Sequence, residues 1–259
     1  MNYNYHTHTA RCGHAIGTDE EYVLRAIEGG MEFMGFADHV PLMFSDGTQT
    51  GHRVPVEKAE EYCRSIAHLR EKYKDRIDIK TGFEIEYYEE YFDDVVRNAI
   101  ACGAEYLIVG QHYISPENNG GKHAIKGTDK NEDLDAYVKC LEAAMKSGYI
   151  TYIAHPDMFN FSGDADYYRQ RVRDICTMSK SCNVPLEINF LGIRDNRIYP
   201  NGEFWRIAGE VGCPAVFGLD AHTPQDACDP ASLEKAKRIV DKYGVNYIGK
   251  PTVKDIRRK

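Results

Sequence analysis

Histidines are the most informative residues of this 259-residue sequence, because they recur where predicted strands end. Seven of the ten histidines lie directly after a predicted strand or in the loop that leaves it: His6, His8, His14, His39, His112, His155 and His222. In an α/β barrel the C-terminal ends of the strands converge on one face, so residues far apart in the sequence meet around one cavity. Neutral imidazole is a common metal ligand. The pattern therefore predicts a metal site at one mouth of a barrel.

Short motifs support this prediction when they are taken together. His6-Thr7-His8 follows a strand, where alternate side chains project to the same side, so both imidazoles can reach one ion. An isolated His-x-His is more often a pair of surface or hydrogen-bonded histidines. Here it is accompanied by His14, Asp38-His39 and Asp220-Ala221-His222, each after a predicted strand or in its loop. Metal binding is therefore the better interpretation.

A site with several ions also needs a bridging carboxylate, and two candidates follow the third predicted strand. Glu84 ends that strand and Glu86 lies two residues further on, hence on the same side. A carboxylate has two oxygens and can bridge two cations, whereas an imidazole binds one. Either glutamate could instead pair with Arg or Lys; we prefer Glu84 as the bridge. Of the other histidines, His68 is expected on the exposed side of a helix, and His52 and His123 in loops that could touch substrate.

The elements that must position these residues alternate between β-rich runs and amphipathic stretches, which is typical of βα units and a parallel sheet. Strands are predicted over residues 2–5, 33–37, 77–83, 106–109, 152–154, 186–189 and 215–217, giving about seven units. Helices are predicted between them, one opening with a capping box at Thr18 to Glu21 and another with Pro55 as its first residue. A closed or nearly closed barrel, formed by a single domain over residues 1–259, is the expected architecture.

The amino-acid composition limits the classes of partner that this protein is expected to bind. The formal charge of −8 and pI near 5.7 disfavour a nucleic-acid substrate, because such binding depends on Lys and Arg neutralising phosphates. A small anion could still bind where metal ions supply local positive charge. No segment has the roughly 20 apolar residues needed to span a membrane or the features of a signal peptide, and the eight cysteines include no C-x-x-C pair. We therefore expect a cytoplasmic protein with reduced thiols and no membrane partner.

The chain resembles the polymerase and histidinol phosphatase (PHP) superfamily, in particular its histidinol-phosphatase branch. The resemblance covers nearly the whole chain and rests on motifs in family order: His6-Thr7-His8, His14, Asp38-His39, Gly82-Phe83-Glu84, Gly110-Gln111-His112, Ala154-His155-Pro156, Glu187-Ile188-Asn189 and Gly218-Leu219-Asp220-Ala221-His222. It implies an α/β fold, a distorted (β/α)7 TIM-like barrel. Gln111 departs from the family pattern, since many relatives carry a smaller residue there.

The resemblance also implies three divalent metal ions and their ligands. The first ion would be held by His6, His8, Glu84 and Asp220, the second by Glu84, His112 and His155, and the third by His14, His39 and His222. Nitrogen and carboxylate ligands without sulfur suit Zn, Mn or Fe. The substrate-binding arginines that match best are Arg194 and Arg197, with Arg53 as a weaker candidate.

These features predict a metal-dependent phosphomonoesterase with catalytic carboxylates Asp38, Glu84 and Asp220. A water between the first two ions would attack phosphorus in line, while the third ion and an arginine hold the phosphoryl oxygens. The proton for the leaving group would come from Asp38 or from a histidine that binds no metal, a choice that the sequence leaves open.

The substrate implied by the resemblance is a small phosphate ester, L-histidinol phosphate, and the pathway histidine biosynthesis. A nucleotide or sugar phosphate is the alternative within the same chemistry. Two other classes were weighed: an amidohydrolase-type barrel, which would leave His14, His39 and His222 without a role together, and a metal-loaded regulatory domain without turnover.

Overall fold

The computed structural model describes residues 1–258 and contains an eight-stranded parallel sheet whose strands neighbour one another in chain order. The strands are β1 (Tyr3–Asn4), β2 (Phe33–His39), β3 (Asp78–Ile85), β4 (Tyr106–Val109), β5 (Ile150–Ile153), β6 (Leu186–Asn189), β7 (Pro214–Gly218) and β8 (Asn246–Tyr247). Their side chains are almost all buried, as expected for parallel strands covered on both faces.

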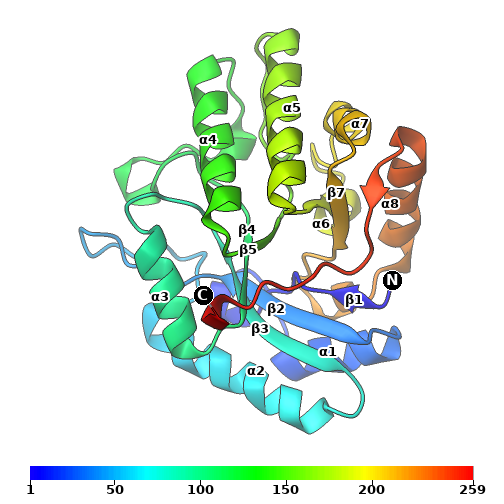
Figure 1. The fold of residues 1–259 in the computed structure, drawn as a ribbon. Helices are drawn as coiled ribbons and strands as arrows, with labels where there is room; N and C mark the ends of the chain where they lie inside the picture. Colours follow the sequence, from blue (N-terminus) through cyan, green and yellow to red (C-terminus); the bar gives the residue numbers. More distant parts are fainter. Residues whose placement is uncertain (259) are drawn as a thin grey trace.

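Helices surround the curled sheet on its outer side (Figure 1). They are α1 (Asp19–Glu28), α2 (Ala59–Tyr73), α3 (Phe92–Cys102), α4 (Asn131–Ser147), α5 (Ala165–Cys182), α6 (Phe190–Arg194), α7 (Gly202–Val211) and α8 (Pro230–Tyr243). Within residues 1–258, no helix combines the length and apolar character needed to cross a membrane.

Two predicted helix starts had different outcomes. The capping box before α1 is confirmed: the Thr18 hydroxyl accepts from Glu21 N, and the Glu21 carboxylate accepts from Thr18 N at 2.7 Å. The prediction for Pro55 is wrong. Pro55 precedes a 3-10 turn over Val56–Lys58, and α2 begins only at Ala59. Proline is equally suited to the position before such a turn, since it has no N–H to donate.

The predicted TIM-like α/β barrel is confirmed, with one strand more than the pattern indicated. The backbone beyond β1 meets the backbone beyond β7, where Thr7 and Ala221 form a parallel bridge and His8 N donates to Ala221 O at 2.9 Å. The first seven strands thus curl until their ends touch. The eighth strand, β8, pairs with β7. Because β8 has only two residues, no periodic pattern in the sequence could indicate it.

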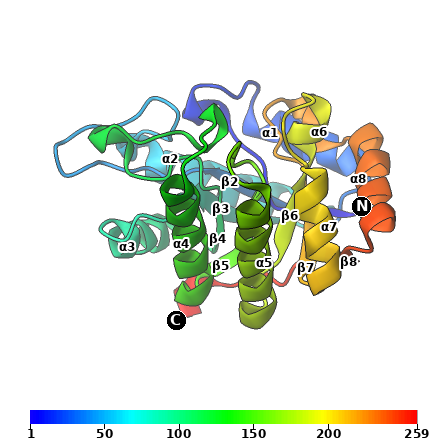
Figure 2. The ribbon, with the colours of Figure 1, turned by 90° about the horizontal axis from the view of Figure 1, so that it is seen from above.

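The interior of the curled sheet is filled below the strand ends by what we call the inner cluster, a second group of buried side chains separate from the helix-facing core. Its buried members are Tyr3, Tyr5, Ala37, Tyr106, Ile108, Tyr152, Ala154 and Val216. The C-terminal segment crosses this end of the barrel, with Ile256 N donating to Glu105 O and Ile248 N to Ala215 O. In Figure 2 that segment lies on the side opposite the long loops after β2 and β4 and helix α6. The open mouth is therefore the one formed by the C-terminal strand ends.

Candidate metal centre

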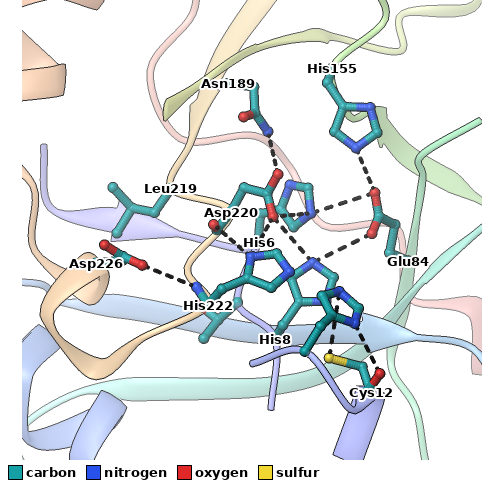
Figure 3. A network of polar contacts seen from close by, with 12 residues as sticks. His6, His8, Cys12, Glu84, His155, Asn189, Leu219, Asp220, His222 and Asp226 are labelled. Atoms are coloured by element: carbon teal, nitrogen blue, oxygen red, sulfur yellow. Dashed lines mark hydrogen bonds and ion pairs between the residues drawn. The ribbon is translucent and has the colours of Figure 1, made fainter. Parts of the chain in front are cut away.

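Glu84 is the central residue of the mouth. It is buried near the C-terminal end of β3, and its Oε1 lies 2.9 Å from His155 Nε2 and 3.5 Å from His6 Nε2. Its Oε2 lies 3.2 Å from His39 Nδ1 and 3.5 Å from His8 Nε2. Figure 3 shows His155 contacting this carboxylate from above and the His6 and His8 rings from the left. A carboxylate with separate imidazoles on each oxygen has the arrangement expected of a bridge between two cations.

Asp220 supplies the second carboxylate. Its Oδ1 lies 3.5 Å from His6 Nε2 and 3.3 Å from His8 Nε2, and its Oδ2 accepts from the Asn189 amide at 3.0 Å (Figure 3). Asp220 and His155 both adopt positive φ angles, 47° and 30°, which non-glycine residues rarely do. Backbone strain of this kind concentrates at functional sites, where the surrounding structure holds it in place.

A third group contains only imidazoles. The nitrogens of His8, His14, His39 and His222 lie within 4.8 Å of one another. His14 is exposed and His222 partly so, whereas His8 and His39 are buried. The three histidines expected around a third ion thus come together in the structure, with His8 shared between this group and the first.

The remaining expected ligand, His112, lies at the edge of the centre. Its Nε2 is 3.8 Å from Glu84 Oε1, and one of its nitrogens groups with a His39 nitrogen and a Glu84 carboxylate oxygen. His155 groups with His6 and Asp220. All nine expected ligands therefore surround one space, and the Nε2 atoms of His112 and His155 lie 3.8 Å and 2.9 Å from the same oxygen, Glu84 Oε1.

Glycine makes this crowding possible at two positions. A Cβ at Gly110 would lie 1.8 Å from Glu84 Oε1, and a Cβ at Gly218 would lie 1.7 Å from Glu187 Oε1. Neither carboxylate could keep its place beside a larger residue, because these separations are far below van der Waals contact.

Carboxylates behind the imidazoles orient them. Glu187 Oε1 lies 2.8 Å from His6 Nδ1, and Glu86 Oε1 lies 2.8 Å from His112 Nδ1. Such partners set the tautomer and aim the other ring nitrogen at a metal. Sequence reasoning assigned Glu187 no role, although its alternation with Asn189 at the end of β6 could have marked both as facing the barrel interior. Glu86 therefore differs from Glu84. Its carboxylate contacts Nδ1 of His112, whereas Glu84 occupies the bridging position.

Asp38, expected as a catalytic carboxylate, also lies behind a candidate ligand. It is fully buried, its Oδ1 lies 3.3 Å from His8 Nδ1, and its Oδ2 accepts from Thr9 N at 3.1 Å. It does not line the cavity. A carboxylate in this position can orient the imidazole of His8 toward a metal ion.

The donor atoms fit divalent cations. His6 Nε2, His39 Nδ1, Glu84 Oε2 and Asp220 Oδ1 are all buried without a hydrogen-bond partner. Leaving such atoms unpaired costs roughly 1–3 kcal/mol each, so a ligand that satisfies them together is expected. Imidazole nitrogens and carboxylate oxygens suit Zn, Mn or Fe.

Electrostatics supports the same conclusion. Burial opposes ionisation of Glu84, but His112, His6 and His39 outweigh it and hold its pKa well below the ordinary value. Burial and the neighbouring His8 lower the pKa of His222 to about 3, so its ring is neutral and can donate a lone pair. Burial also lowers the pKa of His39 well below the ordinary value.

His6 behaves in the opposite way. Burial acts to lower its pKa, but Glu187, Asp220 and Glu84 outweigh burial and raise the pKa well above the ordinary value. The buried carboxylates therefore favour a positive charge at His6, which a proton or a metal ion can provide.

The centre lies in a cavity of about 890 Å³, whose wall includes Arg194 and Arg197. Arg194 is held by several partners: Asp226 at 3.3 Å, Asp229 at 3.2 Å and the Asp220 carbonyl at 3.0 Å. Arg197 pairs with Asp195 at 2.9 Å and its side chain is 37% exposed, so it is the freer of the two guanidinium groups. Both lie where an anion in the cavity could reach them.

Arg53 differs from the expectation of a substrate contact. It is buried, does not line the cavity, and lies 2.7 Å from Glu86 and 2.6 Å from Glu117. Its side chain therefore neutralises carboxylates behind the wall. His68 is exposed on α2 as expected, whereas His52 and His123 line the cavity.

Comparison with known proteins agrees with this geometry. Residues 4–190 match the PHP domain family. The histidinol-phosphatase of Bacillus subtilis is 31% identical over 254 residues, covering 85% of this chain and 93% of that protein. The probable histidinol-phosphatase of Deinococcus radiodurans is 27% identical over 231 residues, covering 85% of each chain.

A solved structure shares the fold over almost the whole length. The histidinol phosphate phosphatase of Lactococcus lactis, complexed with zinc, L-histidinol and phosphate, superimposes with a TM-score of 0.70 at 18% identity, covering 99% of this chain and 97% of that one. The family match, the relatives and the grouping of the expected ligands all lead to one assignment: this chain belongs to the PHP domain family.

Proposed function

We propose that this chain is a metal-dependent phosphomonoesterase that hydrolyses L-histidinol phosphate to L-histidinol and phosphate. The observation that carries the proposal is the environment of Glu84, whose two oxygens face four buried imidazoles while a further imidazole group lies beside them. Two relatives named as histidinol-phosphatases and the ligands of the Lactococcus lactis structure support the choice of substrate.

The residues would hold three ions. Glu84 would bridge two of them, with His6, His8 and Asp220 on one side and His112 and His155 on the other. His14, His39 and His222 would hold the third. Divalent ions bound there supply Lewis acidity, which activates water and neutralises charge on a phosphoryl group.

The other residues have separable tasks in hydrolysis. Glu187, Glu86 and Asp38 keep their imidazoles oriented, so that no reorganisation is needed when the substrate arrives. Arg197 is the side chain best placed to bind phosphoryl oxygens, because its side chain is 37% exposed against 17% for Arg194. Arg194 is tied to carboxylates and completes the positive side of the cavity.

The proposal is tested by measuring metal content and phosphate release on the same preparation. We expect bound Zn, Mn or Fe and release from histidinol phosphate well above that from a nucleoside monophosphate or a sugar phosphate. Preference for one of the latter two would change the substrate while keeping the chemistry.

Matched variants separate the centre from general effects of losing a histidine. His155→Ala should lose metal and activity, whereas His68→Ala on the exposed side of α2 should retain both. A metal-replete protein that releases phosphate from none of these esters would contradict the proposal and favour a regulatory domain.

A further inference from the structure

Three partly exposed rings that are not among the candidate ligands form part of the cavity wall, besides the buried ring of Tyr199. His52 comes from the loop after β2, and Tyr113 and His123 come from the loop after β4. We call these three residues the ring wall. The His52 and Tyr113 rings stack with centroids 5.7 Å apart at 27°, and the Tyr113 and His123 rings lie 4.8 Å apart.

The ring wall borders the metal centre on the side of two candidate ligands. The His39 ring lies 5.9 Å from the His52 ring, and the His112 ring lies 6.2 Å from the His123 ring. The arginines of the wall are instead tied to Asp195 and to the carbonyl of Asp220. The cavity therefore offers charged groups at one border of the centre and partly exposed ring faces at another.

The loop after β4, which carries Tyr113 and His123, is held in place before any substrate binds. Tyr113 and His123 face each other in an antiparallel bridge, and the Gln111 amide donates to Tyr113 O at 2.7 Å. The departure from the family pattern at Gln111 thus acts on this loop.

A buried ion pair provides a second fastening. Glu117, in the middle of the loop, lies 2.6 Å from Arg53 Nη2 and 3.4 Å from His52 Nε2, and it accepts from Tyr88 OH at 2.9 Å. Arg53 and Glu117 are thus positioning residues that join the two loops of the ring wall. A preformed surface loses little conformational entropy when it binds.

Partly exposed π faces favour a flat unsaturated group, since stacking or edge-to-face contact with an aromatic ring is worth more than the buried area alone. A phosphoryl group or a ring-free alcohol cannot make such a ring–ring contact. We infer that the ring wall is the subsite for a heteroaromatic ring carried by the leaving alcohol of the ester. This inference rests on the proposed function and extends it by assigning the residues that select the alcohol.

The test compares two esters that share the phosphoryl group and differ in the alcohol. Tyr113→Ala should raise KM for histidinol phosphate about 3- to 10-fold, the range expected for one aromatic contact, with a smaller change in kcat. KM for glycerol 3-phosphate, which has no ring, should stay as in the unmodified protein. Tyr113→Phe should restore the preference, and Tyr167→Ala on α5, outside the cavity wall, is the matched control.

A binding measurement distinguishes a failure of the ring wall from a failure of the proposed phosphatase activity. Calorimetry with L-histidinol and inorganic phosphate, on the metal-loaded protein, should show weaker L-histidinol binding in Tyr113→Ala by a similar factor. Equal changes in KM for both esters, or no change for either, would overturn the ring wall while leaving phosphatase activity intact. If instead the unmodified protein hydrolyses no ester, the proposed function fails, and L-histidinol binding still decides the ring wall.

Glu117→Gln tests the ion pair between Glu117 and Arg53 that joins the two loops of the ring wall. It removes the charge that faces Arg53 but keeps the shape of the side chain. We expect KM for histidinol phosphate to rise about as much as in Tyr113→Ala, with kcat largely kept and KM for glycerol 3-phosphate unchanged. A fall in kcat for both esters would show that the loop supports the metal centre rather than the alcohol subsite.

Discussion

Asp157 allows the energetic effect of burial near the site to be measured. It follows β5 by a few residues and is fully buried, and its Oδ2 accepts from Asn201 N at 2.6 Å and from Trp205 Nε1 at 2.8 Å. Its Oδ1 has no hydrogen-bond partner. Burial outweighs these two hydrogen bonds and raises the pKa of Asp157 from 3.8 to about 6.

The sign and size of the effect on stability follow from proton linkage. Between pH 4 and 6 the folded protein keeps a proton on Asp157 that the unfolded chain has lost, so the stability that this group contributes at low pH disappears as pH rises through about 6. Each pH unit is worth about 1.4 kcal/mol, so a rise from 3.8 to about 6 corresponds to about 3 kcal/mol in the free energy of unfolding.

Asp157→Asn removes the titration and keeps the shape. The amide oxygen can accept from both Asn201 N and Trp205 Nε1, and the amide nitrogen takes the place of the unpaired oxygen. We expect the variant to gain about 3 kcal/mol relative to the unmodified protein between pH 4 and pH 7, measured by urea unfolding of both proteins after chelation of metals. A constant difference across this range would refute the reasoning, because Asp157 would then be ionised throughout.

Three further predictions concern the metal centre. Glu84→Gln should abolish phosphate release and lower the bound metal while circular dichroism shows an intact fold; full activity would exclude the bridge. Glu187→Gln should weaken metal binding about 10- to 100-fold through the loss of His6 orientation, measured by competition with a chelator, and unchanged affinity would remove Glu187 from this role. Arg197→Ala should raise KM for phosphate esters about 10-fold or more with metal content unchanged, since it removes a charge-assisted hydrogen bond to substrate; unaltered kinetics would assign Arg197 to the surface.

The grouping of the candidate ligands was predictable because it depends on a local rule. Each of these residues lies at the C-terminal end of a strand or in the loop after it, and in a parallel barrel the ends of strands converge whatever the details of packing. The preference for Glu84 over Glu86 had the same basis: β3 runs to Ile85, so Glu84 still lies within the regular strand. Both side chains point the same way, and only the end of the strand distinguishes them.

The roles of Asp38, Glu187 and Arg53 were not predictable in this way, because they depend on distances between segments that are far apart in the chain. Asp38 lies at the end of β2 beside His39, yet its side chain turns toward Thr9 and His8 behind the centre. Arg53 lies in a loop above the mouth but folds inward to meet two buried carboxylates. A charged residue in a loop shows its partner only once the loops are placed against each other.

The inner cluster affects how small molecules enter and leave the metal centre. Buried tyrosines fill the barrel beneath the centre and the C-terminal segment passes across its floor, so in the described residues 1–258 the route for ester, alcohol and phosphate is the mouth at the C-terminal strand ends. If the alcohol rests against the ring wall and phosphate lies deeper, among the proposed ions, we expect the alcohol to depart first. Phosphate would then be the last occupant, and its accumulation would slow the entry of the next ester.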